Sequence, residues 1–147
     1  MRLFHSDLSA TLAILFLLAS CNPGPQKGDL QHLPGYWEIT KVIFPDGTEK
    51  EYKVSATIEY LQWDGTNGYR KKMQPTLEGT YLTSDDALPM QIIWRDDRLF
   101  LKFIGAEDTW EEEILQIEAG KLIMRHGNGL KYIYQKYEPM TIGKDNV

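Results

Sequence analysis

Short segments of alternating apolar and polar residues make up most of the chain after residue 34, and turn-forming residues separate them. Nine segments of this kind occur: 35–44, 56–63, 68–74, 77–83, 90–95, 99–104, 109–118, 121–125 and 130–137. No stretch of ten or more residues repeats its apolar positions with a helical period. The pattern predicts an all-β domain of eight or nine strands.

The links between these segments favour tight hairpins. They include Pro45-Asp46-Gly47, Asp64-Gly65, Asp96-Asp97 and Gly127-Asn128-Gly129. Hairpins join neighbouring antiparallel strands, and closing the sheet removes the exposed edges that a sandwich would leave. We therefore predict a small antiparallel up-and-down β-barrel.

Alternation along the strands also predicts the interior. If Trp37 faces inward, Ile39, Lys41 and Ile43 do so too, and the other strands contribute mostly apolar and aromatic residues. Such a lining either fills an eight-stranded barrel or surrounds one small, lipophilic ligand, and both remain open. The residues predicted to bind a ligand are Tyr60, Trp94, Phe103, Tyr132 and Tyr134.

Glu112 conflicts with an apolar interior because it shares a strand face with Trp110 and Ile114. Facing inward, it would meet Lys41, Lys102 or the polar head of a ligand. A β-bulge that turns it outward is the alternative.

The N-terminus carries an apolar run at about 10–19, after Arg2. This run is too short to span a membrane and is typical of a secretory signal. The residues that end it, Leu18-Ala19-Ser20-Cys21, resemble the lipobox of bacterial lipoproteins. The resemblance implies a diacylglyceryl group on the Cys21 sulfur, cleavage before Cys21 and acylation of its new amino group, for example by palmitate.

Four segments follow from these patterns. We predict a signal peptide at 1–20, a lipidated Cys with a flexible tether at 21–33, the barrel at 34–138 and a polar tail at 139–147.

A second resemblance rests on Leu33-Pro34-Gly35-Tyr36-Trp37, which contains Gly-x-Trp, and on the final strand LKYIYQKYE. Together with the predicted meander, these residues resemble the lipocalin-like domains of Bacteroidota lipoproteins over most of 33–138. The resemblance implies that Trp37 closes the narrow end of the barrel and that a basic residue of the last strand packs over it. Lys136 is the candidate here, where lipocalins use Arg.

Composition excludes several kinds of chemistry. A net charge of −5 disfavours nucleic acid and anionic lipid surfaces as partners. The single cysteine allows no internal disulfide, and the two histidines after the predicted signal, His32 and His126, favour neither a catalytic triad nor a zinc site. We therefore expect a non-enzymatic protein without a cofactor.

The sequence thus predicts an envelope lipoprotein whose barrel binds a small hydrophobic or amphipathic ligand. The alternative is a non-catalytic protein-interaction or envelope-assembly module with a filled core. Surface-exported lipoproteins of the family that the chain resembles carry an acidic cluster after the Cys, and none follows Cys21. The resemblance therefore implies a lipid anchor on the periplasmic face of the outer membrane, and we expect a monomer.

Overall fold

The structure, a computed structural model, describes residues 23–76, 80–83 and 86–138. Its elements are η1 (Lys27–His32), β1 (Gly35–Ile43), β2 (Glu49–Glu51), β3 (Ile58–Trp63), β4 (Gly68–Pro75), β5 (Tyr81–Thr83), β6 (Leu88–Arg95), β7 (Arg98–Ile104), β8 (Thr109–Ile117), β9 (Lys121–Arg125) and β10 (Lys131–Lys136).

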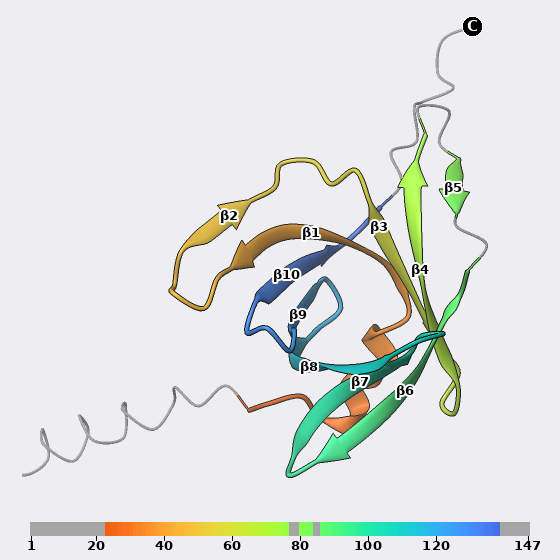
Figure 1. The fold of residues 1–147 in the computed structure, drawn as a ribbon, viewed down its shortest axis with the longest axis vertical. Helices are drawn as coiled ribbons and strands as arrows, with labels where there is room; N and C mark the ends of the chain where they lie inside the picture. The colour runs from red at the N-terminus through yellow and green to blue at the C-terminus, as the bar shows by residue number, and fades with distance from the viewer. Residues whose placement is uncertain (1–22, 77–79, 84–85, 139–147) are drawn as a thin grey trace, which may run out of the picture.

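Eight of the strands form a closed antiparallel barrel (Figure 1). They follow one another in the order β1-β3-β4-β6-β7-β8-β9-β10, and β10 pairs with β1 to complete the ring. The predicted up-and-down barrel is therefore confirmed.

Two short strands lie off this ring, β2 beside β1 and β5 beside β4. The sequence did not predict β2, because Glu49, Lys50 and Glu51 are all exposed and lack an apolar alternation. β5 is the end of the predicted segment 77–83, of which 77–79 lie outside the described residues.

The hairpin turns follow the predicted chemistry. Asp96 and Asp97 both have positive φ, 50° and 58°, as the two central residues of a tight β6–β7 hairpin turn require. Gly47 has a φ of 87° in the β1–β2 turn, where its N–H donates to the carbonyl of Phe44 over 2.9 Å.

One end of the barrel is covered by η1 and the residues after it. Leu30 and Leu33 belong to the buried core cluster together with Trp37. The tether predicted for 21–33 is therefore wrong from Lys27 onward, because these two leucines remove their side chains from water by packing under the strands.

Trp37 and Lys136 face each other across the β1–β10 pair at this covered end. The Trp37 indole is fully buried and donates from Nε1 to the carbonyl of Leu33 over 2.9 Å. The Lys136 ammonium lies 4.0 Å from the indole centroid and donates to the carbonyls of His32 (2.9 Å) and Pro34 (2.7 Å).

Gly35 makes this arrangement possible. Its backbone φ is 128°, a value that residues with a side chain rarely adopt. A Cβ at this position would lie 3.0 Å from both Cε and Nζ of Lys136. The glycine of Gly-x-Trp thus has a steric role beside the lysine.

A β-bulge shifts the alternation in β1. The register slips between Ile39 and Lys41, so that Val42 becomes a buried residue. The prediction that Lys41 and Ile43 face inward is wrong for this reason. Lys41 instead donates to Glu49 of β2 over 2.6 Å.

Within the part of the chain that is described, no helix has the length and apolar character needed to cross a membrane.

Replacing Trp37 with alanine tests the packing at the covered end. We expect the free energy of unfolding to fall by about 3–5 kcal/mol, because a fully buried indole leaves a cavity and Lys136 loses its ring partner. Urea denaturation measures this change. A loss below about 1 kcal/mol would contradict the packing described.

Candidate functional site: a buried charge cluster

Four ionisable side chains gather inside the barrel towards its far end, opposite η1. They are Glu59 of β3, Arg70 of β4, Glu112 of β8 and His126 just after β9. The strand register turns the first three inward, opposite the buried residues Trp37, Leu61 and Leu101 respectively. The cluster therefore follows from the pairing that closes the barrel.

Arg70 is the centre of the cluster. Its Nη1 donates to both oxygens of Glu112, at 3.2 and 3.1 Å, and lies 3.7 Å from Oε2 of Glu59. The guanidinium carbon stands 3.9 Å from the centroid of the Phe103 ring and 6.0 Å from that of Trp110. Ion pairing and cation–π contact together fix where this charge sits.

The Glu112 side chain is only 2% exposed, and both of its carboxylate oxygens accept hydrogen bonds. Besides Arg70, the indole Nε1 of Trp110 donates to its Oε1 over 3.0 Å. The bulge in β8 falls between Ile114 and Gln116, so it leaves Glu112 facing inward. Of the two predicted alternatives the inward one is confirmed, but the predicted partners Lys41 and Lys102 are wrong, because Lys102 pairs in register with Glu111 on the outer face.

Glu59 is poorly satisfied by comparison. Its Oε2 is buried without a hydrogen-bond partner. Burial raises the pKa of Glu59 above its usual value, an effect that Arg70 opposes and that the charge of Glu112 reinforces. Buried polar atoms without partners are uncommon in proteins, so this oxygen is a candidate for contact with a ligand.

His126 has the same feature on the other side of the cluster. Its Nε2 is buried 3.3 Å from Oε2 of Glu112, but without a hydrogen bond. Burial lowers the pKa of His126, so the ring is mainly neutral at pH 7. The ring stacks on Tyr132, with 4.1 Å between centroids.

Three of the predicted ligand-binding residues surround this cluster. Phe103 and Tyr134 are fully buried, and Tyr132 packs against the core with its centroid 6.3 Å from that of Tyr134. Trp94 is placed elsewhere, at the end of the barrel covered by η1, where it pairs in register with Leu99.

Tyr60 does not face the interior, so the prediction of its inward orientation is wrong. Because Glu59 is opposite Trp37, Tyr60 lies opposite Tyr36 on the outer face. Its ring centroid is 4.7 Å from that of Tyr36 and 6.1 Å from that of Tyr69. β3 buries both Ile58 and Leu61, so alternation alone does not assign its faces.

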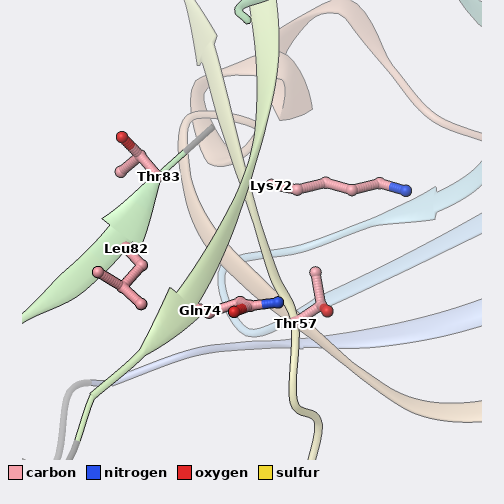
Figure 2. Close-up of a pocket in the computed structure, with 5 residues that line it drawn as sticks. All are labelled: Thr57, Lys72, Gln74, Leu82 and Thr83. Atoms are coloured by element: carbon pink, nitrogen blue, oxygen red, sulfur yellow. The ribbon is translucent and has the colours of Figure 1, made fainter. Parts of the chain in front are cut away.

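A pocket of about 310 Å³ lies at the far end (Figure 2). It is lined by Thr57, Lys72, Gln74, Leu82 and Thr83. Thr57 precedes Glu59 by two residues on β3, and Lys72 follows Arg70 by two on β4, so each shares a face with its neighbour in the cluster. Figure 2 shows Lys72 extending from β4 away from β5.

A second pocket, of about 510 Å³, lies at the end covered by η1. Trp63, Ile92 and Trp94 line it together with Leu30 of η1. It is separate from the charge cluster, and Trp94 belongs to this pocket.

The described residues include no group of three or more His, Cys, Asp or Glu side chains placed to hold a metal ion.

Sequence reasoning missed Glu59, Arg70 and His126. Arg70 begins a basic run with Lys71 and Lys72, in which no single residue stands out. The strand register is what identifies Glu59 and Arg70. Once Trp37 faces inward, Glu59 opposite it on β3 does so too, and the pairing of β3 with β4 then places Arg70 on the same face.

No protein-family model matches the sequence, and no curated protein matches it. Among solved structures, a lipocalin-like protein from Bacteroides uniformis is similar at 12% identity and a TM-score of 0.47, over 72% of this chain and 99% of that one. An uncharacterized protein from Bacteroides eggerthii is similar at 13% identity and a TM-score of 0.46, over 71% of this chain and 99% of that one. Apocrustacyanin C2 is similar at 10% identity and a TM-score of 0.45, over 76% of this chain and 64% of that one.

Replacing Glu59 with glutamine tests the unsatisfied carboxylate. The pKa of Glu59 is higher in the folded than in the unfolded protein. Its protonation therefore stabilises the folded state at a pH below the unfolded pKa, and this contribution is lost as the pH rises through the folded pKa. At pH 7 we therefore expect Glu59→Gln to stabilise the protein by about 1 kcal/mol. Urea denaturation should show the gain shrinking as the pH falls towards 4.5, the usual value.

Glu113→Gln is the matched control. Arg98, and then Arg125, lower the pKa of Glu113, so its contribution is present at pH 7 and is lost as the pH falls through the folded pKa. This variant should be destabilised at pH 7. Equal losses in both variants would mean that Glu59 is paired as well as Glu113.

Proposed function

We propose that this protein is a non-catalytic binding protein that takes a small amphipathic molecule at the far end of its barrel. The observation that carries the proposal is the buried Oε2 of Glu59, which has no hydrogen-bond partner inside a barrel otherwise well packed. A ligand that enters through the pocket of Thr57, Lys72 and Gln74 reaches this atom along the inward faces of β3 and β4.

The surroundings of the cluster support an amphipathic ligand. Phe103, Tyr132 and Tyr134 provide apolar ring faces, and Glu59 and His126 provide unsatisfied polar atoms. Sites for small molecules commonly combine an apolar lining with a few polar groups that fix orientation.

The same proposal includes anchoring in the outer membrane through Cys21, facing the periplasm. It is supported by the sequence Leu18-Ala19-Ser20-Cys21 after the apolar run. Two or more acyl chains hold a protein stably at a membrane, where one chain binds reversibly.

The alternative is a protein-interaction or envelope-assembly module. It is favoured by the packed core that includes Trp37, in which Leu33, Leu99 and Leu122 are fully buried. In that case the domain would present only its outer surface to a partner.

Binding of a neutral dye, N-phenyl-1-naphthylamine, distinguishes the two. We expect saturable fluorescence enhancement with unlipidated residues 21–147. Gln74→Trp, which fills the far-end pocket from an exposed position, should weaken dye binding by about tenfold. Its free energy of unfolding should change by less than about 0.5 kcal/mol.

Trp94→Leu is the control for this experiment, because Trp94 lines the other pocket. It should leave dye affinity unchanged. Absence of dye binding, together with native mass spectra that show only the bare protein, would favour the interaction module. Weakening by Trp94→Leu alone would move the site to the pocket beside η1.

Cys21→Ser tests the anchor independently. This variant should take up no radiolabelled palmitate and should accumulate as an unprocessed or soluble form, because the acylated sulfur is missing. Unchanged partitioning into detergent would refute the lipid anchor and leave the barrel proposal in place.

A further inference from the structure

The charges inside the barrel do not balance. Arg70 brings one positive charge, whereas Glu59 and Glu112 bring two negative ones, and His126 is mainly neutral at pH 7. Among the described residues, no basic nitrogen other than that of Arg70 lies within ion-pair distance of the Glu59 carboxylate. The ionised cluster therefore carries a net charge of about −1 in a desolvated place.

We propose that the far-end site recognises a protonated primary amine on its amphipathic ligand, with the Glu59 carboxylate as the partner of that amine. The inference rests on the proposed function and adds the chemical class of the head group.

The hydrogen-bonding capacity of the site fits an ammonium group. An ionised carboxylate only accepts hydrogen bonds, and Oε2 of Glu59 has no donor. The Arg70 nitrogen recorded nearest to this atom is Nη1 at 3.7 Å, and its hydrogen bonds go to the two Glu112 oxygens. An ammonium brings three donors and a positive charge, which completes the pairing that Arg70 begins.

The aromatic rings around the cluster favour the same charge. Burial, and then the charge of Glu59, raises the pKa of Tyr134. Tyr132 stands next to Tyr134, with centroids 6.3 Å apart. Ring faces attract cations, and desolvated sites strengthen this attraction. Phe103 already uses a face for the guanidinium of Arg70.

An anionic head group is disfavoured at this position. A fatty-acid carboxylate beside Glu59 would place a third negative charge near a single guanidinium. Lys72 pairs in register with Glu59, and its charge lowers the pKa of that carboxyl, but the Lys72 side chain is exposed and the recorded ion pair of Glu59 is with Arg70. Water and salt screen such a charge, so it does not replace a partner at Glu59.

Three amphiphiles with the same chain and different heads test the proposal: dodecylamine, dodecanol and dodecanoate. Each displaces N-phenyl-1-naphthylamine from unlipidated residues 21–147 at pH 7, below the concentration at which it forms micelles. We expect dodecylamine to bind about tenfold more tightly than dodecanol and dodecanoate to bind weakest. Glu59→Gln should remove the advantage of the amine and leave dodecanol unchanged.

Glu38→Gln is the matched control. Glu38 lies opposite Ile58, the residue before Glu59, and its Oε1 accepts from Gln135 at an exposed position. This variant should keep the wild-type ranking. Circular dichroism checks that both variants are folded.

Two outcomes overturn the inference alone. One is that the dye binds but dodecanoate displaces it as well as dodecylamine does. The other is that Glu59→Gln leaves amine affinity unchanged. If the dye itself does not bind, the proposed function fails and the inference fails with it.

Discussion

One guanidinium, that of Arg70, lies between two carboxylates inside the barrel, and this arrangement decides which of the two is fully hydrogen-bonded. Arg70 is held by Glu112 at about 3.1–3.2 Å and by the ring of Phe103, which leaves Glu59 at 3.7 Å and without a hydrogen bond on Oε2. Charges buried in a protein are expensive unless they are paired and hydrogen-bonded. The barrel therefore keeps one carboxylate whose hydrogen bonding is incomplete, and the proposed function assigns this carboxylate to a ligand.

The two ends of the barrel differ in how well their polar groups are hydrogen-bonded. Near η1, Lys136 packs over the Trp37 ring and donates to the carbonyls of His32 and Pro34, Trp37 donates to the carbonyl of Leu33, and the surrounding core is apolar. The packing at this end fixes the positions of the strands that begin or end there. The far end carries the polar atoms that lack partners, so binding energy is available there without disturbing the core. Preorganised polar groups on strands lose little entropy when they meet a ligand.

The sequence predicted the barrel because alternation and turn chemistry agree along nearly the whole chain. It placed Phe103, Tyr132 and Tyr134 on inward faces correctly, since the alternation holds through these positions of β7 and β10. For Glu112 it left two alternatives open, and the inward one is confirmed because the bulge in β8 comes after this residue. It failed for Lys41, where a β-bulge shifts β1, and for Tyr60, where both faces of β3 carry buried residues.

The charge cluster was beyond sequence reasoning for a different reason. Glu59, Arg70, Glu112 and His126 come from separate parts of the chain, 42 residues apart in the case of Arg70 and Glu112. Their proximity depends on strand register and on the closing of the ring, neither of which a local pattern specifies. A charged residue within an alternating segment also looks the same whether it faces water or an ion pair.

The pKa of the Glu59 carboxyl group, followed by its side-chain carbon-13 resonance, is the most direct test of an unsatisfied carboxylate inside the barrel. Assignment comes from the signal that Glu59→Gln removes. We predict a titration midpoint above the usual value of 4.5 for the free protein and a downward shift when dodecylamine is added. A midpoint at or below the usual value in the free protein would show that Glu59 is already paired, and would contradict the account.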